Sequence, residues 1–87
     1  MTNVKEKLQE LGFEETVILE NPSYFTAITG ISSHGNLIYD YDLMIEDLID
    51  NENMSYEEAI EFINFNTIRA IDYMGEFKPI IMMNIED

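Results

Sequence analysis

The sequence predicts a single α+β domain over residues 1–87, in which a small antiparallel sheet of three to four strands packs against two or three helices. Three observations support this fold class. The hydrophobic share of 46% is typical of a folded protein. Short runs of β-branched and aromatic residues fill the first half of the chain, as strands require. Apolar residues then recur at helical spacing in the second half, behind signals typical of helix starts.

Four strands are predicted, at residues 16–20 (TVILE), 24–31 (YFTAITGI), 37–40 (LIYD) and 80–84 (IIMMN). The Asn-Pro-Ser sequence at 21–23 and the segment 32–36 have the composition of turns. The first three strands would therefore form an antiparallel meander. Pro79 precedes the last strand and fits the first residue of a strand or an edge position.

Three helices are predicted, over residues 3–11, from Asp40 or Asp42 to about Asp50, and from Ser55 toward Gly75. Gly12 is expected to end the first helix. Asp40 or Asp42 would cap the second, whose inner face would carry Ile45, Leu48 and Ile49. In the third helix Glu58 would complete a capping box with Ser55. Its inner stripe would consist of Ala59, Ile60, Phe62, Ile63, Thr67, Ala70 and Ile71.

The net charge of −14 bears on the class of partner. Direct binding to nucleic acid is disfavoured, because that affinity comes from Lys and Arg replacing counterions on phosphates. Anionic membrane surfaces are disfavoured for the same reason. A basic partner is favoured, since a field of this size steers association. The alternative is that acidity only keeps a small protein dissolved.

No leader is expected, because residues 1–15 lack an apolar core of signal-peptide length. No membrane segment is expected, because no apolar run approaches the ~18–20 residues of a membrane helix. The expected location is the cytoplasm of a bacterial host cell.

Half of the eighteen acidic residues lie between residues 40 and 61, on the last two predicted helices and the segments that flank them. Such a surface could imitate DNA, which presents about one negative charge per ~1.7 Å of duplex. The alternating segment Tyr39-Asp40-Tyr41-Asp42 adds two aromatics, which are common at interfaces, although one of them could instead pack in the core. The predicted partner-binding residues are Asp40, Asp42, Glu46, Asp47, Asp50, Glu57, Glu58, Glu61, Tyr39 and Tyr41.

No catalytic or metal-binding constellation is apparent, and the protein is predicted not to be an enzyme and to need no cofactor. The chain has no cysteine and one histidine, His34, in a predicted loop. An EF-hand loop requires glycine at its sixth position, and a loop counted from Asp50 has Ser55 there. Paired carboxylates are abundant, but at this density they are typical of a solvated helix face.

A possible ligand-binding site is predicted at Asn66, Thr67 and Arg69. Asn and Thr are poor helix formers, and here they stand in the second half of a helix beside the only cation between Lys7 and Lys78. They could form a polar recognition site, for example for a nucleotide signal. The alternative is structural, with Arg69 paired to Asp72 three residues later or to a neighbouring carboxylate, and with the amides bonded to backbone groups across the sheet.

The segment from Leu37 to Met82 resembles a family of small, uncharacterised acidic proteins from phages and mobile elements of Gram-positive bacteria. The resemblance is carried by YDYDLMIEDL, MSYEEAIEFI, NTIRA and the closing PII, about half of the chain. Members often have proline near position 72, where this chain has Asp72. The resemblance implies an anti-defence role but no site residues.

The predicted function is therefore a phage or mobile-element protein that binds and inhibits a host nucleic-acid-binding nuclease, as an anti-CRISPR does, through a DNA-mimicking acidic surface. Two alternatives are a small-molecule binder and a structural or regulatory protein-interaction domain.

Overall fold

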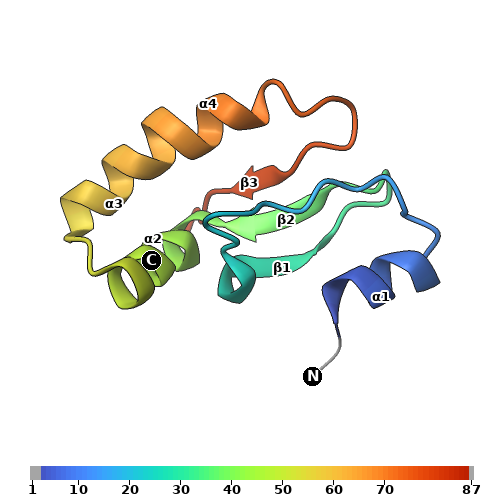
Figure 1. Cartoon of the computed structure of the whole chain (residues 1–87), viewed down its shortest axis with the longest axis horizontal. Helices are drawn as coiled ribbons and strands as arrows, with labels where there is room; N and C mark the ends of the chain where they lie inside the picture. The colour runs from blue at the N-terminus through green and yellow to red at the C-terminus, as the bar shows by residue number, and fades with distance from the viewer. Residues whose placement is uncertain (1–2, 87) are drawn as a thin grey trace.

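The protein is an α+β fold in which a three-stranded sheet packs against helices (Figure 1). The computed structural model describes residues 3–86. In chain order the elements are α1 (Val4–Glu10), the 3₁₀ turn η1 (Phe25–Ala27), β1 (Ile28–Ile31), β2 (Leu37–Asp40), α2 (Tyr41–Glu52), α3 (Tyr56–Phe62), the π-helical turn η2 (Ile63–Thr67), α4 (Ile68–Ile71) and β3 (Ile80–Met82). The fold class predicted from the sequence is confirmed.

The sheet is mixed, with strand order β1-β2-β3. β1 and β2 form an antiparallel hairpin, and Gly35 in its turn has φ +90°, a conformation that favours glycine. β3 pairs with β2 in parallel, with Ile38 opposite Ile80. The prediction of an antiparallel sheet was therefore wrong for the last strand. The reason is topological: the chain leaves β2, crosses over through the helices and returns in the same direction.

The predicted strand at residues 16–20 was also wrong. This segment belongs to no strand, and its backbone meets the rest of the protein at isolated points. Val17 N–H donates to the Phe77 carbonyl at 3.2 Å, and Leu19 N–H donates to the Tyr39 hydroxyl at 3.0 Å. In the next predicted strand, residues 25–27 form η1 and only the second half becomes β1. Strand formation depends on an available partner strand, and neither segment pairs with a strand of the sheet.

The core lies between the sheet and a helical rod formed by α3, η2 and α4, which follow one another without a break from Tyr56 to Ile71 (Figure 1). Leu19 reaches Tyr39 on the sheet and the Tyr24 hydroxyl contacts the Thr67 hydroxyl at 2.7 Å on the rod, so the segment that carries Leu19 and Tyr24 fills the space between the two layers. The largest fully buried side chains are Tyr24, Tyr39, Met44, Leu48 and Ile63.

Local capping signals account for where α2 and α3 begin. The Asp40 carboxylate accepts the Leu43 N–H at 3.1 Å and caps α2, which runs through Glu52, slightly beyond the predicted end. The predicted capping box of α3 is confirmed: Glu58 N–H donates to Ser55 Oγ at 3.1 Å, and Ser55 N–H donates to Glu58 Oε1 at 2.9 Å. The rod ends at Ile71, before Gly75.

Candidate functional site

Four of the eight predicted partner-binding acids are held by hydrogen bonds within the protein, and we call them the bonded carboxylates: Asp40, Asp42, Asp47 and Glu58. At the start of α2, the Asn84 side-chain amide donates to both Asp40 oxygens at 3.1 and 3.3 Å and to Asp42 Oδ2 at 3.0 Å. Residues more than forty positions apart are thereby joined, and two carboxylates share one donor group.

Asp47 and Glu58 are bonded within or beside their own helices. The Asp47 carboxylate accepts the Thr26 hydroxyl at 2.9 Å and the Asn51 amide at 3.1 Å. The hydrogen bonds of the capping box, that of the Ser55 backbone N–H above all, hold the pKa of Glu58 below its ordinary value of 4.5. The hydrogen bonds of these carboxylates stabilise the fold, whether or not the same carboxylates also contact a partner.

The other four, which we call the unbonded carboxylates, are Glu46, Asp50, Glu57 and Glu61. All four are exposed, and none has a hydrogen-bond or ion-pair partner among residues 3–86. Within the described part of the chain the one ion pair is Lys7–Glu10, at 3.7 Å on α1. The four form two pairs with the same spacing: Glu46 and Asp50 on α2, and Glu57 and Glu61 on α3.

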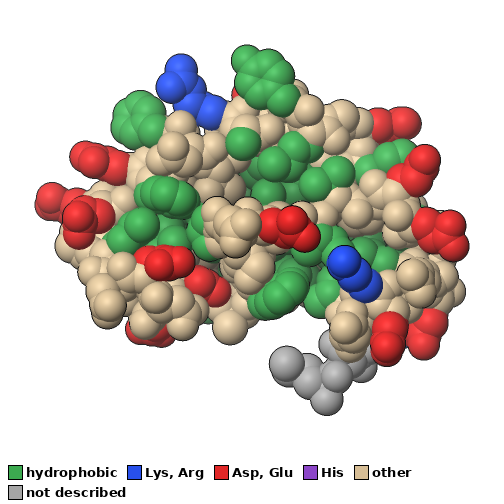
Figure 2. All heavy atoms as spheres, in the orientation of Figure 1, with side chains coloured by type: hydrophobic (Ala, Val, Ile, Leu, Met, Phe, Trp, Pro, Cys, Tyr) green, Lys and Arg blue, Asp and Glu red, His purple; other side chains and the backbone are tan. Residues whose placement is uncertain are grey.

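Both pairs lie on the sides of their helices that face away from the core. In α2 the buried residues are Met44, Ile45 and Leu48, roughly opposite the Glu46–Asp50 stripe at 100° per residue. α2 and α3 pack against each other at one end of the molecule (Figure 1). On the face shown in Figure 2, many acidic side chains lie at the edges, including this end, hydrophobic side chains gather toward the middle with an acidic side chain among them, and Lys or Arg are few.

The two tyrosines of the predicted partner surface differ in accessibility. Tyr39 is fully buried, and the pKa of its hydroxyl is raised by burial. Tyr39 is a core residue whose hydroxyl accepts the Leu19 N–H, so it is not part of the proposed surface. Tyr41 is half-buried at the start of α2, and its hydroxyl donates to Asn64 Oδ1 at 3.3 Å.

The three residues of the predicted ligand site are not brought together. Thr67 is buried and bonded to Tyr24, whereas Asn66 and Arg69 are exposed on the rod. The predicted Arg69–Asp72 ion pair is not formed in the described part of the chain. The poor helix formers at 63–67 instead coincide with the π-helical turn η2, in which Ile68 N–H donates to the Ile63 carbonyl. A shallow hollow of about 390 Å³ beside this turn is lined by Met54, Glu58, Glu61, Phe62, Phe65 and Asn66.

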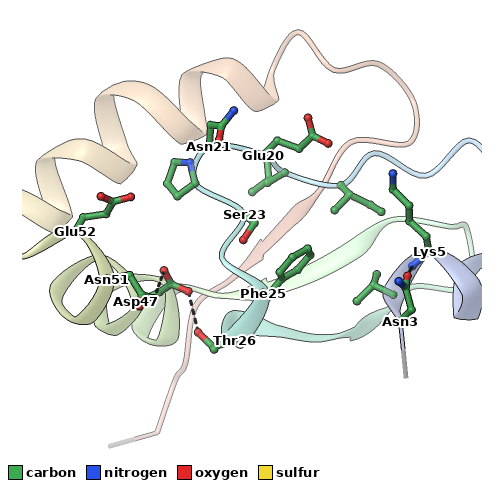
Figure 3. A pocket seen from close by; sticks show the side chains of 14 residues that line it. Asn3, Lys5, Glu20, Asn21, Ser23, Phe25, Thr26, Asp47, Asn51 and Glu52 are labelled. Atoms are coloured by element: carbon green, nitrogen blue, oxygen red, sulfur yellow. Dashed lines mark hydrogen bonds between the residues drawn. The ribbon is translucent and has the colours of Figure 1, made fainter. Parts of the chain in front are cut away.

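A second hollow is a groove of about 980 Å³ that was not predicted from the sequence (Figure 3). It is bordered by α1, the extended segment at 18–23, η1 and the C-terminal end of α2. Phe25 stands in its middle, between Asp47, Asn51 and Glu52 on one side and Asn3 and Lys5 on the other (Figure 3). Residues 18–25 contain two positive-φ residues, Asn21 and Tyr24, which form the bend at one wall.

No group of three or more His, Cys, Asp or Glu side chains within residues 3–86 is placed to hold a metal ion. His34 lies in the hairpin turn, 3.3 Å from the Ser33 hydroxyl. Among the described helices, none has the length and apolar character needed to cross a membrane.

The chain was compared with models of protein families, with curated proteins and with solved structures, and none of them matches it.

Proposed function

We propose that this protein binds a basic, nucleic-acid-binding protein and blocks it, and that the outer sides of α2 and α3 form the contact surface. The observation that carries the proposal is the pair of unbonded stripes, Glu46–Asp50 and Glu57–Glu61. Each places two like charges one helical turn apart with no cation beside them among the described residues.

Among residues 3–86 these stripes contribute no hydrogen bond or ion pair to the fold. A like-charge pair four residues apart destabilises a helix by about 0.2–0.5 kcal/mol. A basic partner would supply the missing counter-charges and would be steered toward this end of the molecule. The bonded carboxylates add negative potential to the same region while serving the fold.

Charge spacing indicates how far the imitation of DNA can go. Acids four residues apart on a helix are separated by ~6 Å along its axis, whereas one DNA strand carries a phosphate per ~3.4 Å. One stripe thus has about half the linear charge of a single strand. The exposed side chains of Leu43 on α2, Tyr56 on α3 and Phe65 on the adjoining turn η2 would add apolar contact area. The proposed surface is therefore a mixed acidic and apolar one.

The family resemblance of residues 37–82 makes a host nuclease, such as a CRISPR effector, the first partner class to test. In this proposal the protein acts as a non-enzymatic inhibitor inside the bacterial host cell. It would occupy the basic channel in which the nuclease holds nucleic acid, so nucleic acid and this protein would compete.

The test is a capture experiment from a Gram-positive host lysate, with elution by rising salt and then by competitor DNA. We expect a basic nucleic-acid enzyme to elute under both conditions, because both screen or replace the acidic contacts. The double variant Glu46→Lys/Asp50→Lys should capture much less of it. The matched control is Glu6→Lys/Glu10→Lys, which changes the net charge equally on α1. Equal loss in the two variants, or a captured partner indifferent to salt and DNA, would refute the proposed surface.

A further inference from the structure

One wall of the groove is a stretch of extended backbone. One of its two edges makes no backbone hydrogen bonds to residues 3–86. Val17 and Leu19 direct their N–H groups to Phe77 and Tyr39, toward the body of the protein. In an extended chain, the N–H and C=O groups of successive residues point to opposite edges. The backbone groups of Ile18 and Glu20 therefore face the other way, and they have no hydrogen-bond partner among residues 3–86. Ile18, Leu19 and Glu20 all line the groove.

The side chains around this edge define the chemistry of an occupant. The middle of the groove is apolar, with Ile18, Pro22 and a Phe25 side chain that is 59% exposed. The end beside α2 is negative, because Asp47 and Glu52 line it and the last turn of α2, which ends at Glu52, has no basic residue. Two hydrogen bonds leave the Asp47 carboxylate with further acceptor sites.

We propose that the groove binds an extended peptide segment of the basic partner, which adds as a β-strand beside residues 18–20. An apolar side chain of the peptide packs on Phe25, and a Lys or Arg side chain lies near Asp47 and Glu52. This inference rests on the proposed function, since the same partner supplies the peptide. α2 links the two surfaces, because Asp47 and Asn51 border the groove while Glu46 and Asp50 face solvent.

Strand addition also accounts for the mismatch between sequence and structure at residues 16–20. The sequence TVILE is rich in residues that favour strands, yet the segment pairs with no strand of its own sheet. An added peptide would supply the missing ladder at Ile18 and Glu20. Main-chain hydrogen bonds then contribute affinity, and the pockets on either side select the side chains.

The probe is the capped pentapeptide acetyl-Val-Lys-Val-Lys-Val-amide, and its binding is measured by calorimetry and by amide NMR. We expect chemical-shift changes and slowed hydrogen exchange at the Ile18 and Glu20 amides. The same peptide with every backbone nitrogen methylated cannot donate backbone hydrogen bonds, although its Lys side chains still can, and its binding should be lost. The analogue with Glu in place of Lys should also fail to bind, because the α2 end of the groove is negative.

Matched variants separate the groove from the rest of the surface. Phe25→Ala should weaken binding of the pentapeptide about tenfold, as loss of one large apolar contact does. Phe65→Ala, which removes a phenylalanine of similar exposure from the rod, should change it less than about twofold. Glu52→Gln should weaken binding more than Glu57→Gln. All four changes are at exposed side chains, so the variants are expected to fold.

Two results would overturn the inference. One is that the methylated peptide binds as well as the parent peptide. The other is that Phe65→Ala weakens binding as much as Phe25→Ala. Either result would leave the proposed function standing, because that function is tested by charge reversal at Glu46 and Asp50, outside the groove. Conversely, the pentapeptide could bind in the groove while the Glu46→Lys/Asp50→Lys variant captures as much partner as the wild-type protein. That result would count against the acidic surface and leave the groove standing.

Discussion

The bonded and the unbonded carboxylates make an internal comparison, because both groups lie on the same two helices. Asp47 and Asp50 are three residues apart on α2, yet Asp47 holds Thr26 and Asn51 while Asp50 has no partner among the described residues. On α3, Glu58 closes the capping box and Glu57, its neighbour, has no such bond. Adjacent acids can thus serve the fold or leave their charge available to solvent and partners.

This difference shows that the number of acidic residues alone does not indicate which carboxylates are available to bind a partner. Half of the predicted partner-binding acids have hydrogen bonds that a substitution would break, so their variants mix stability with binding. The unbonded four can be changed with little structural consequence. Four predictions sharpen this distinction.

The largest effect is expected for Asp47→Ala. The substitution removes the acceptor of both the Thr26 and the Asn51 side chains, and we expect it to lower the free energy of unfolding by about 1–2 kcal/mol. Asp50→Ala, on the same helix, should change it by less than about 0.5 kcal/mol. Urea denaturation followed by circular dichroism measures both. Similar losses in the two variants would erase the distinction between bonded and unbonded acids.

A smaller loss is expected when the capping box of α3 is opened. Ser55→Ala leaves the Glu58 N–H without its acceptor and should lower the free energy of unfolding by about 1 kcal/mol. For a domain of this size that corresponds to a fall in Tm of about 4–8 °C. The control is Glu61→Ala, which removes an exposed acid from the same helix without touching the cap. A Tm unchanged by Ser55→Ala would contradict the assigned cap.

The Glu58 carboxylate should also make stability depend on pH. Because its pKa is lowered in the folded protein, its contribution is present above the ordinary value of 4.5 and is lost as pH falls through the folded-state value. Glu58→Gln should therefore be less stable than the wild-type protein near pH 6, and the gap should narrow toward pH 3. Thermal melts of both proteins across this range measure the gap. A gap that stayed constant would exclude a stabilising role for the charged form.

The smallest effect has the opposite sign. The double variant Glu46→Gln/Glu61→Gln relieves one like-charge contact in each stripe while leaving the first-turn acids of α3 in place, and it should stabilise the protein by about 0.2–0.5 kcal/mol per pair at low salt. The gain should shrink at about 0.5 M NaCl, because salt already screens exposed charges. Thermal melts at the two salt concentrations test it. A gain that salt does not reduce would show that the stripes do not repel.

Local signals in the sequence were sufficient to predict where α2 and α3 begin. Ser55 and Glu58 are three residues apart, and so are Asp40 and Leu43, whose N–H the Asp40 carboxylate accepts at the start of α2. Both helix starts could therefore be predicted. The hairpin turn and β2 were also predicted, from turn residues followed by LIYD. These features depend on residues only a few positions apart along the chain, so they can be recognised in the sequence itself.

Features that depend on distant residues could not be predicted. Asp47 is bonded to Thr26, and Asp42 to Asn84, across 21 and 42 residues, so the sequence could not separate bonded from unbonded acids. The same limit applies to Tyr39, whose alternation with Tyr41 left open which of the two would be buried. Residues 16–20 have strand-like composition, but composition does not say whether a partner strand exists.

The parallel pairing of β3 has a consequence for the order in which the chain folds. The β1–β2 hairpin closes across a short turn, whereas Ile38 meets Ile80 only after about 40 intervening residues, a loop whose closure costs more entropy. Such long-range pairing slows folding relative to local contacts. We therefore expect the hairpin and the helices to form early. The pairing of β3 with β2 should form last and complete the native structure.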